Sequence, residues 1–191
     1  MDQLWTPWRY AYTTGQGTSA RKGVPAELTD FPDDHGSVFL NLIGAVQWAE
    51  RSGRMSRVAA ERAGNVLLQA EWNFVCLNAF PYTSGHLMVV PYERVASLAA
   101  LPAEAAAEMM SLARRMETAL RSVYRPDGIN LGMNLGEAAG AGVADHLHLH
   151  MLPRWVGDTN FMTVVGETRV LPEVLADTWA RLRKALGEAV E

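Results

Sequence analysis

Polar and apolar residues alternate strictly along His146–Met151, within the segment Asp145–Pro153 that reads Asp-His-Leu-His-Leu-His-Met-Leu-Pro. Such alternation is typical of a half-buried β-strand, in which residues i, i+2 and i+4 share a face. We therefore predict a strand over residues 146–153, with the imidazoles of His146, His148 and His150 on one face and the apolar residues between them on the other. Pro153 has no backbone N–H, so we expect the strand to end there.

Other hydrophobic patterns predict the remaining elements. Four apolar, β-rich stretches predict strands over 65–69, 72–78, 86–90 and 129–134, the first two forming a hairpin. Helical spacing of apolar residues predicts helices over 37–50, 102–123 and 172–190. Five strands with appended helices indicate an α+β domain built on an antiparallel sheet, with a long helix and a C-terminal helix.

The first 36 residues differ from the rest of the chain. Residues 1–12 are rich in Trp and Tyr, and residues 13–36 are rich in Thr, Gly, Pro and Asp. This composition predicts an N-terminal arm and loop over 1–36, followed by one domain over 37–191. We expect the aromatic arm to pack on the domain surface, although one of its rings could instead help to wall a binding pocket. His35 is expected at the surface.

Composition narrows the class of protein. The chain has 191 residues, 49% of them hydrophobic and 20% charged, as in globular domains. A formal net charge of −4 argues against a nucleic-acid-binding surface. The single Cys76 excludes an internal disulfide. With no signal-peptide pattern and no apolar run of membrane-spanning length, we expect a cytoplasmic protein that contacts no membrane.

Three histidines on one strand face admit two kinds of chemistry, namely metal binding and nucleophilic catalysis. The preceding residues 134–145 are mostly small and include three glycines. Glycine-rich loops let backbone N–H groups approach an anion, so we predict a phosphate cradle at Gly140, Ala141 and Gly142. By itself, such a loop could also be an ordinary flexible connection.

These motifs together resemble the histidine triad (HIT) family. The resemblance is carried by Asn134-x-Gly136, by Ala139-Gly140 and by the triad His146-x-His148-x-His150. Residues 153–155, 157–162 and 4–9 are similar to the branch that contains bacterial diadenosine tetraphosphate phosphorylases. The resemblance implies a HIT-like fold and a homodimer in which the two sheets run on into one.

The resemblance also implies roles for individual residues. The middle histidine, His148, would be the nucleophile that forms a nucleotidyl-histidine, while His146 and His150 would hydrogen-bond the phosphate oxygens. The residues implied in nucleotide and phosphate binding are Asn78, His86, Asn134, Gly140, Ala141, Gly142 and Arg154. For His86, a strand histidine bonded to backbone is an equally good interpretation, and Arg9 is a second arginine that could add charge.

The implied reaction is nucleotidyl transfer or hydrolysis at the α-phosphate of an AMP-containing substrate. Phosphorolysis of a diadenosine polyphosphate to ADP and ATP fits the resemblance best. One alternative is a HIT hydrolase that releases AMP from a dinucleoside polyphosphate or a nucleoside phosphoramidate. Two further alternatives are a metal-dependent hydrolase that uses the histidine cluster and a nucleotide-binding module without turnover.

We expect the protein to bind no structural zinc. In the zinc-containing relatives that the resemblance brings in, the zinc ligands are two cysteines, a histidine and the first triad histidine. The corresponding residues here are Ser37, Leu40, Arg94 and His146. A structural zinc site needs four ligands, so the resemblance predicts neither a metal site nor a bound cofactor. A divalent cation is expected only as a companion of the nucleotide substrate.

Overall fold

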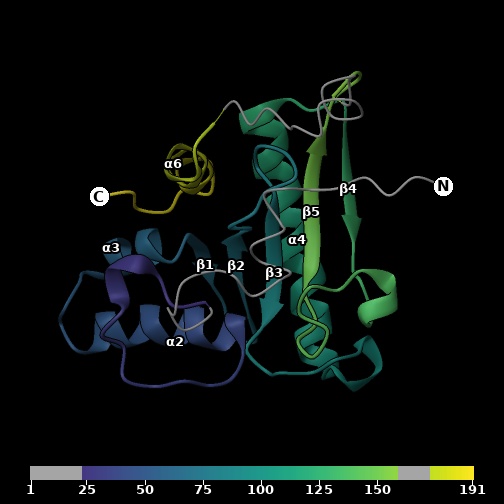
Figure 1. Ribbon diagram of the computed structural model, residues 1–191. Coiled ribbons are helices and arrows are strands. Elements are labelled where there is room, and N and C mark those ends of the chain that lie inside the picture. Colours follow the sequence, from purple (N-terminus) through teal and green to yellow (C-terminus); the bar gives the residue numbers. More distant parts are fainter. Residues whose placement is uncertain (1–22, 159–172) are drawn as a thin grey trace, which may run out of the picture.

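The computed structural model describes residues 23–158 and 173–191, and its core is a five-stranded antiparallel sheet (Figure 1). The strands are β1 (Val66–Gln69), β2 (Asn73–Leu77), β3 (Leu87–Pro91), β4 (Gly128–Gly132) and β5 (Leu149–Arg154). They lie in the order β1-β2-β3-β5-β4. The predicted α+β class, the hairpin and the antiparallel sheet are therefore confirmed. The predictions for the aromatic arm, for Arg9 and for residues 159–172 fall outside the described residues.

The helices largely follow the sequence pattern. They are α2 (Val38–Arg51), α3 (Arg57–Ala63), α4 (Ala103–Tyr124) and α6 (Leu175–Ala185), with short 3-10 turns η1 (Ala26–Leu28), η2 (Leu98–Ala100) and η3 (Glu137–Ala139). The predicted helices 37–50 and 102–123 are confirmed to within one residue. The C-terminal helix is shorter than predicted, and its N-cap residue Val174 is 65% exposed. No helix among the described residues is both long enough and apolar enough to cross a membrane.

Helix α3 was not predicted. Its first turn is capped by Ser56, whose hydroxyl accepts a hydrogen bond from the backbone N–H of Ala59. A serine followed by Arg-Val-Ala-Ala-Glu-Arg-Ala is a recognisable helix start, because serine favours the N-cap and alanine favours the helix interior. The helix was missed because seven residues are too few for a clear periodic pattern.

Helices α2 and α4 cover opposite faces of the sheet. Alternate residues of β2 separate accordingly: Val75 and Leu77 pack in the core beneath α4, whereas Phe74 and Cys76 pack in a second core beneath α2. The second core also includes Leu28 and Phe31, so part of the predicted loop 13–36 contributes to the interior. His35 is exposed, as predicted.

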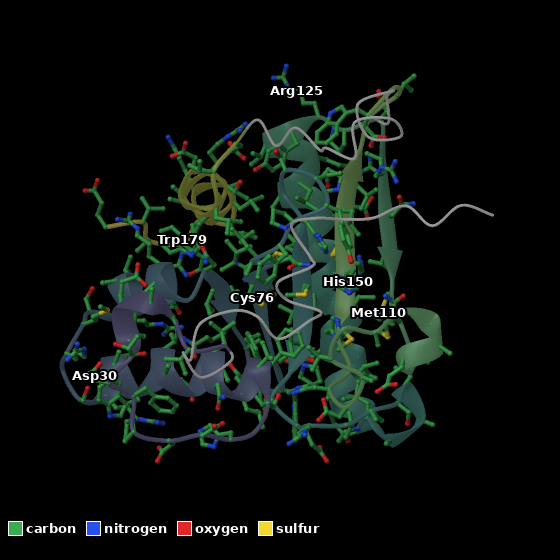
Figure 2. All side chains as sticks on the ribbon, in the orientation of Figure 1. Asp30, Cys76, Met110, Arg125, His150 and Trp179 are labelled. Carbon is green, nitrogen blue, oxygen red and sulfur yellow. The ribbon has the colours of Figure 1, made fainter. Side chains whose placement is uncertain are left out.

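The two edges of the sheet differ. Helix α6, which carries Trp179 (Figure 2), covers the β1 edge. The Trp179 indole donates to the carbonyl oxygen of Val66 at 2.7 Å, and Arg183 donates to that of Leu67 at 3.0 Å. At the other edge, residues 130–132 of β4 are exposed. The side chain of Leu131 is 48% exposed. One edge is therefore closed by side-chain donors, and the other presents an accessible strand.

The triad segment alternates as predicted, but its strand has different ends. Leu147, Leu149 and Met151 lie in the α4-side core, and the histidines lie on the α2 side. Strand β5 begins only at Leu149, and the preceding residues are held by a hydrogen bond from the Leu147 N–H to the Val95 carbonyl oxygen at 2.7 Å.

The prediction that Pro153 ends the strand is wrong, since β5 runs on to Arg154. Pairing between β3 and β5 stops at Leu87 opposite Met151, so beyond this pair β5 has a partner only in β4, where Pro153 lies opposite Ile129. A proline is tolerated there because one side of the strand no longer needs a donor.

Candidate active site

A pocket of about 300 Å³ lies between α2 and the triad. Its wall combines residues from segments far apart in the sequence. They include Phe39 and Leu42 of α2, Ala63, Gly64 and Asn65 at the C-terminal end of α3, Asn78, Phe80 and Tyr82 before β3, Asn134, Gly140, Gly142 and Val143 before the triad, and His148 and His150. A largely apolar cleft with a few polar groups at one place is typical of a small-molecule site.

The apolar part of this pocket follows one face of α2. The Phe39 ring lies 4.9 Å from the His148 ring, measured between centroids. Leu42 is one turn further along α2, and a Cβ added to Gly64 would lie 3.3 Å from Leu42 Cδ1. The pocket therefore extends from the histidines to the end of α3. An apolar slot that ends at polar imidazoles suits a ligand with a flat apolar part and an anionic part.

His148 is oriented by the backbone of its own segment. Its Nδ1 lies 2.8 Å from the carbonyl oxygen of His146. A carbonyl oxygen only accepts hydrogen bonds, so Nδ1 carries the proton and Nε2 keeps its lone pair. Burial lowers the pKa of His148 below its ordinary value, which keeps the ring neutral near pH 7. This tautomer leaves Nε2 as a nucleophile at the pocket wall.

His146 has no nitrogen left for a ligand. Its Nε2 lies 2.9 Å from the Pro91 carbonyl oxygen and must therefore donate, while its Nδ1 lies 2.9 Å from the Ser37 hydroxyl and must accept. Burial is the main cause that lowers the pKa of His146, so the ring is neutral. The predicted hydrogen bond from His146 to a phosphate oxygen does not fit this geometry. The ring instead helps to hold the triad backbone.

His150 is positioned by His86. The Tyr82 backbone N–H donates to His86 Nδ1 at 3.2 Å, so the proton of His86 is on Nε2. That Nε2 lies 3.0 Å from His150 Nδ1, which therefore accepts, so the proton of His150 is on its Nε2. His150, on β5 (Figure 2), lines the pocket, whereas His86 is 1% exposed and does not line it. His86 therefore acts on His150 rather than on a ligand directly.

The glycine-rich loop lines the pocket, but two of the backbone N–H groups predicted to bind phosphate already donate hydrogen bonds within the loop. The Gly140 N–H donates to the Glu137 carbonyl oxygen at 2.9 Å, and the Ala141 N–H donates to that of Gly136 at 3.3 Å. Ala141 does not line the pocket. Within residues 23–158 and 173–191, no backbone acceptor is found for the N–H groups of Gly142 and its neighbour Val143. An anion would meet these two donors.

The remaining predicted residues divide into two groups. Asn78 and Asn134 line the pocket. The Asn78 Oδ1 accepts from the Phe80 N–H at 2.9 Å, and the Asn134 Nδ2 lies 3.4 Å from the Gly140 carbonyl oxygen. Arg154 does not reach the pocket. It binds the Asp158 carboxylate with two nitrogens, at 2.6 and 2.8 Å.

Several pocket residues were not predicted as site residues. Phe39 and Leu42 were assigned only to a helix, and Asn65 and Val143 were not singled out. Asn65 adopts a φ of +52°, which is uncommon outside glycine and follows the end of α3 at Gly64. Helical spacing marks Phe39 and Leu42 as a shared face, but no local signal distinguishes a pocket wall from a core face.

Two of the four positions compared with zinc ligands are in contact, namely Ser37 and His146. Arg94 instead pairs with the Asp145 carboxylate. In the part of the chain that the structure describes, no three His, Cys, Asp or Glu residues come together as a metal cluster. The absence of zinc stays a prediction.

Comparison with known proteins agrees with this geometry. A HIT domain model matches residues 59–156, which is more than half of the chain. The chain is 42% identical over 129 residues to an AP-4-A phosphorylase of Mycobacterium tuberculosis, an alignment that covers 64% of this chain and 66% of that protein. It is 28% identical over 93 residues to a bis(5'-adenosyl)-triphosphatase of Dictyostelium discoideum, with 49% and 62% covered.

Among solved structures, a Zn-bound histidine triad family protein of Mycobacterium smegmatis superposes with a TM-score of 0.57 and 27% identity. That superposition covers 79% of this chain and 93% of the other. The sheet order, the triad on the α2 side and the matched family model lead to one conclusion: the chain belongs to the histidine triad (HIT) family.

Proposed function

We propose that this protein cleaves diadenosine polyphosphates at the α-phosphate through a nucleotidyl-histidine on His148, with inorganic phosphate as the final acceptor. The observation that carries the proposal is the hydrogen bond from His148 Nδ1 to the His146 carbonyl oxygen, which leaves Nε2 as a nucleophile beside the pocket. On diadenosine tetraphosphate, the products would be ATP and ADP.

In the first step, the His148 Nε2 lone pair attacks the α-phosphorus and forms a P–N bond. The bond from the α-phosphorus to the bridging oxygen breaks, and this oxygen leaves with ATP. The attack turns the neutral imidazole into an imidazolium, which the His146 carbonyl oxygen stabilises through Nδ1–H. His150 donates from Nε2 to the oxygens where negative charge develops, the kind of electrostatic contribution that dominates phosphoryl transfer.

In the second step, a phosphate oxygen attacks the α-phosphorus, the P–N bond breaks and ADP is released. The choice of phosphate over water requires an anion site next to the intermediate. The N–H groups of Gly142 and Val143 are suited to this role because the loop does not use them. Arg154 is less suited than the sequence suggested, since Asp158 neutralises it.

The relatives support the same class of substrate. The alignment spans 66% of the length of the M. tuberculosis protein, so the activity named for that protein is proposed for this chain rather than transferred. The Dictyostelium relative, a triphosphatase, makes hydrolysis with release of AMP the second candidate. We further propose that the protein is a cytoplasmic homodimer, and that any divalent cation accompanies the nucleotide.

The proposal is tested by the turnover of diadenosine tetraphosphate at increasing phosphate concentration, with product analysis. ADP and ATP that form only when phosphate is present would support phosphorolysis. AMP and ATP that form at an undiminished rate without phosphate would assign the protein to the hydrolases. Nucleotide binding without any turnover would indicate that the protein is a nucleotide-binding module and not an enzyme.

The role of His148 is tested by His148→Ala. Loss of the nucleophile should reduce turnover by several orders of magnitude, roughly the effect of nucleophile removal in other covalent enzymes. The matched control is His35→Ala, because His35 is exposed and outside the pocket. Radiolabel from an α-³²P-labelled substrate should be trapped on the wild-type protein and on the His35 variant but not on the His148 variant. Near-normal turnover by a folded His148→Ala protein would exclude the mechanism.

A further inference from the structure

Ser37 occupies the N-cap of α2, where a serine hydroxyl ordinarily accepts a hydrogen bond from the first helical turn. The Ser37 hydroxyl makes no such capping bond and lies 2.9 Å from Nδ1 of His146. The side chain is buried, at 4% exposure. Ser56 shows the ordinary behaviour at the N-cap of α3, where it accepts from Ala59. The Ser37 hydroxyl is therefore used by the triad and not by its own helix.

The direction of this hydrogen bond follows from the other side of the ring. His146 Nε2 faces the Pro91 carbonyl oxygen at 2.9 Å and must carry the ring proton. Nδ1 then has only a lone pair, so the Ser37 hydroxyl donates to it. The His146 ring is consequently held between the start of α2 and the end of β3. In addition, the Phe39 ring meets it edge-on, with 5.3 Å between the ring centroids.

This ring determines where the His146 backbone lies. Strand β5 begins only at Leu149, so the sheet does not hold the carbonyl group that orients His148. That group is held by the two ring bonds of His146 and by the hydrogen bond from the Leu147 N–H to Val95. A change in the His146 ring would shift the carbonyl oxygen and with it the Nδ1–H bond of His148.

We propose that Ser37 is a positioning residue for His148, acting through the ring and the carbonyl group of His146. The proposal rests on the proposed role of His148 as the nucleophile. Ser37 does not line the pocket, whereas its neighbours Val38 and Phe39 do. Its contribution is therefore to the orientation of the nucleophile and not to substrate affinity.

The kinetic test compares Ser37→Val with Ser37→Thr, because the two side chains have the same shape and only threonine has the hydroxyl. For Ser37→Val, kcat for diadenosine tetraphosphate should fall about tenfold to hundredfold, as expected for a displaced reacting group, with KM unchanged. Ser37→Thr should restore most of kcat. The control Ser56→Ala removes a true helix cap and should lower Tm while leaving kcat unchanged. If Ser37→Val does not fold, Ser37→Ala replaces it in the comparison.

The spectroscopic test needs no turnover. In protein labelled with ¹⁵N-histidine, ring nitrogen shifts should give His148 as the Nδ1–H tautomer in the wild type and in Ser37→Thr, and as a mixture of tautomers in Ser37→Val. This pattern would support the positioning role even if the wild type failed to cleave the substrate, in which case only the proposed function would be lost. Unchanged kcat and tautomer in Ser37→Val, or equal damage in the Val and Thr variants, would overturn the inference.

Discussion

At the scale of single residues, the three triad histidines have different environments despite their identical spacing. His146 bonds Ser37 and the Pro91 carbonyl oxygen, His148 donates to the His146 carbonyl oxygen, and His150 accepts from His86. Only His148 and His150 line the pocket. In the strand pattern the three positions are equivalent. Their chemical roles differ because each ring has a different hydrogen-bond partner.

Burial of these rings predicts the pH dependence of activity. The pKa values of His146 and His148 lie below the ordinary 6.5, mainly because burial penalises the charged imidazolium. His148 should thus stay neutral and nucleophilic at pH values where an exposed histidine is protonated. We expect the acid limb of kcat/KM to lie below pH 6.5, measured with the His35→Ala variant as control. An acid limb at or above pH 6.5 would contradict the burial argument.

The same shifts affect stability with a definite sign. In the unfolded chain, both histidines bind protons near their ordinary pKa of 6.5, and in the folded protein they do so only at lower pH. Their contribution to stability is therefore fully present above pH 6.5 and is lost as the pH falls through the folded pKa values. The unfolding free energy from urea titrations should accordingly fall between pH 7.5 and pH 5.5, and by less in a His148→Asn variant.

At the scale of elements, α6 is attached to the rest of the fold by a buried ion pair. Arg183 contacts Glu61 of α3 at 2.8 Å and the Leu67 carbonyl oxygen of β1 at 3.0 Å, and both side chains of the ion pair are buried. Glu61 also contacts Arg57, whose side chain is 57% exposed. The pair thus joins the C-terminal helix to the edge strand that it covers.

Loss of the Arg183–Glu61 ion pair should lower the free energy of unfolding. Arg183→Met keeps most of the packing but leaves Glu61 buried without its buried partner, so the unfolding free energy should drop by about 3 kcal/mol. The matched control Arg57→Met removes the exposed partner of the same carboxylate and should cost less than about 1 kcal/mol. Denaturant unfolding followed by circular dichroism measures both. Equal losses in the two variants would show that burial does not distinguish the two arginines.

At the scale of the whole molecule, the sheet is closed at β1 and accessible at β4. Trp179 and Arg183 satisfy carbonyl groups along β1, whereas β4 exposes Leu131 at its middle and is followed by exposed Leu135. An exposed edge strand with apolar side chains is a surface on which another strand can pair. The proposed homodimer would therefore form through β4, with the two sheets continuous.

This geometry predicts that Leu131→Lys weakens the dimer. A charge placed on the β4 edge should repel its symmetry mate and disfavour strand pairing. The protein should elute as a monomer in size-exclusion chromatography with light scattering, while Val174→Lys, a change at an exposed position on the α6 side, should remain dimeric. A wild-type protein that is monomeric at all concentrations, or a dimer unaffected by Leu131→Lys, would exclude an interface through β4.

The features that depend on local spacing follow from the sequence alone. The alternation around His148 assigned the histidines to one face, the apolar spacing over 102–123 predicted the long helix, and the loop with Asn134 indicated the family. Such patterns reflect the backbone period, which neighbouring residues share. These patterns did not predict the short helix α3 or the continuation of β5 through Pro153, because helix caps and strand ends depend on the neighbouring elements of the fold.

Which partners the ring nitrogens of His146 and His150 meet depends instead on contacts between segments far apart in the chain. Ser37 meets His146 across 109 residues, and His86 meets His150 across 64. Arg154, expected at the phosphate, is held by Asp158 instead. These outcomes depend on distances of about 3 Å between groups that the fold brings together, and hydrogen bonds of that length are directional enough to fix a tautomer. Residue type and spacing in the sequence do not contain those distances.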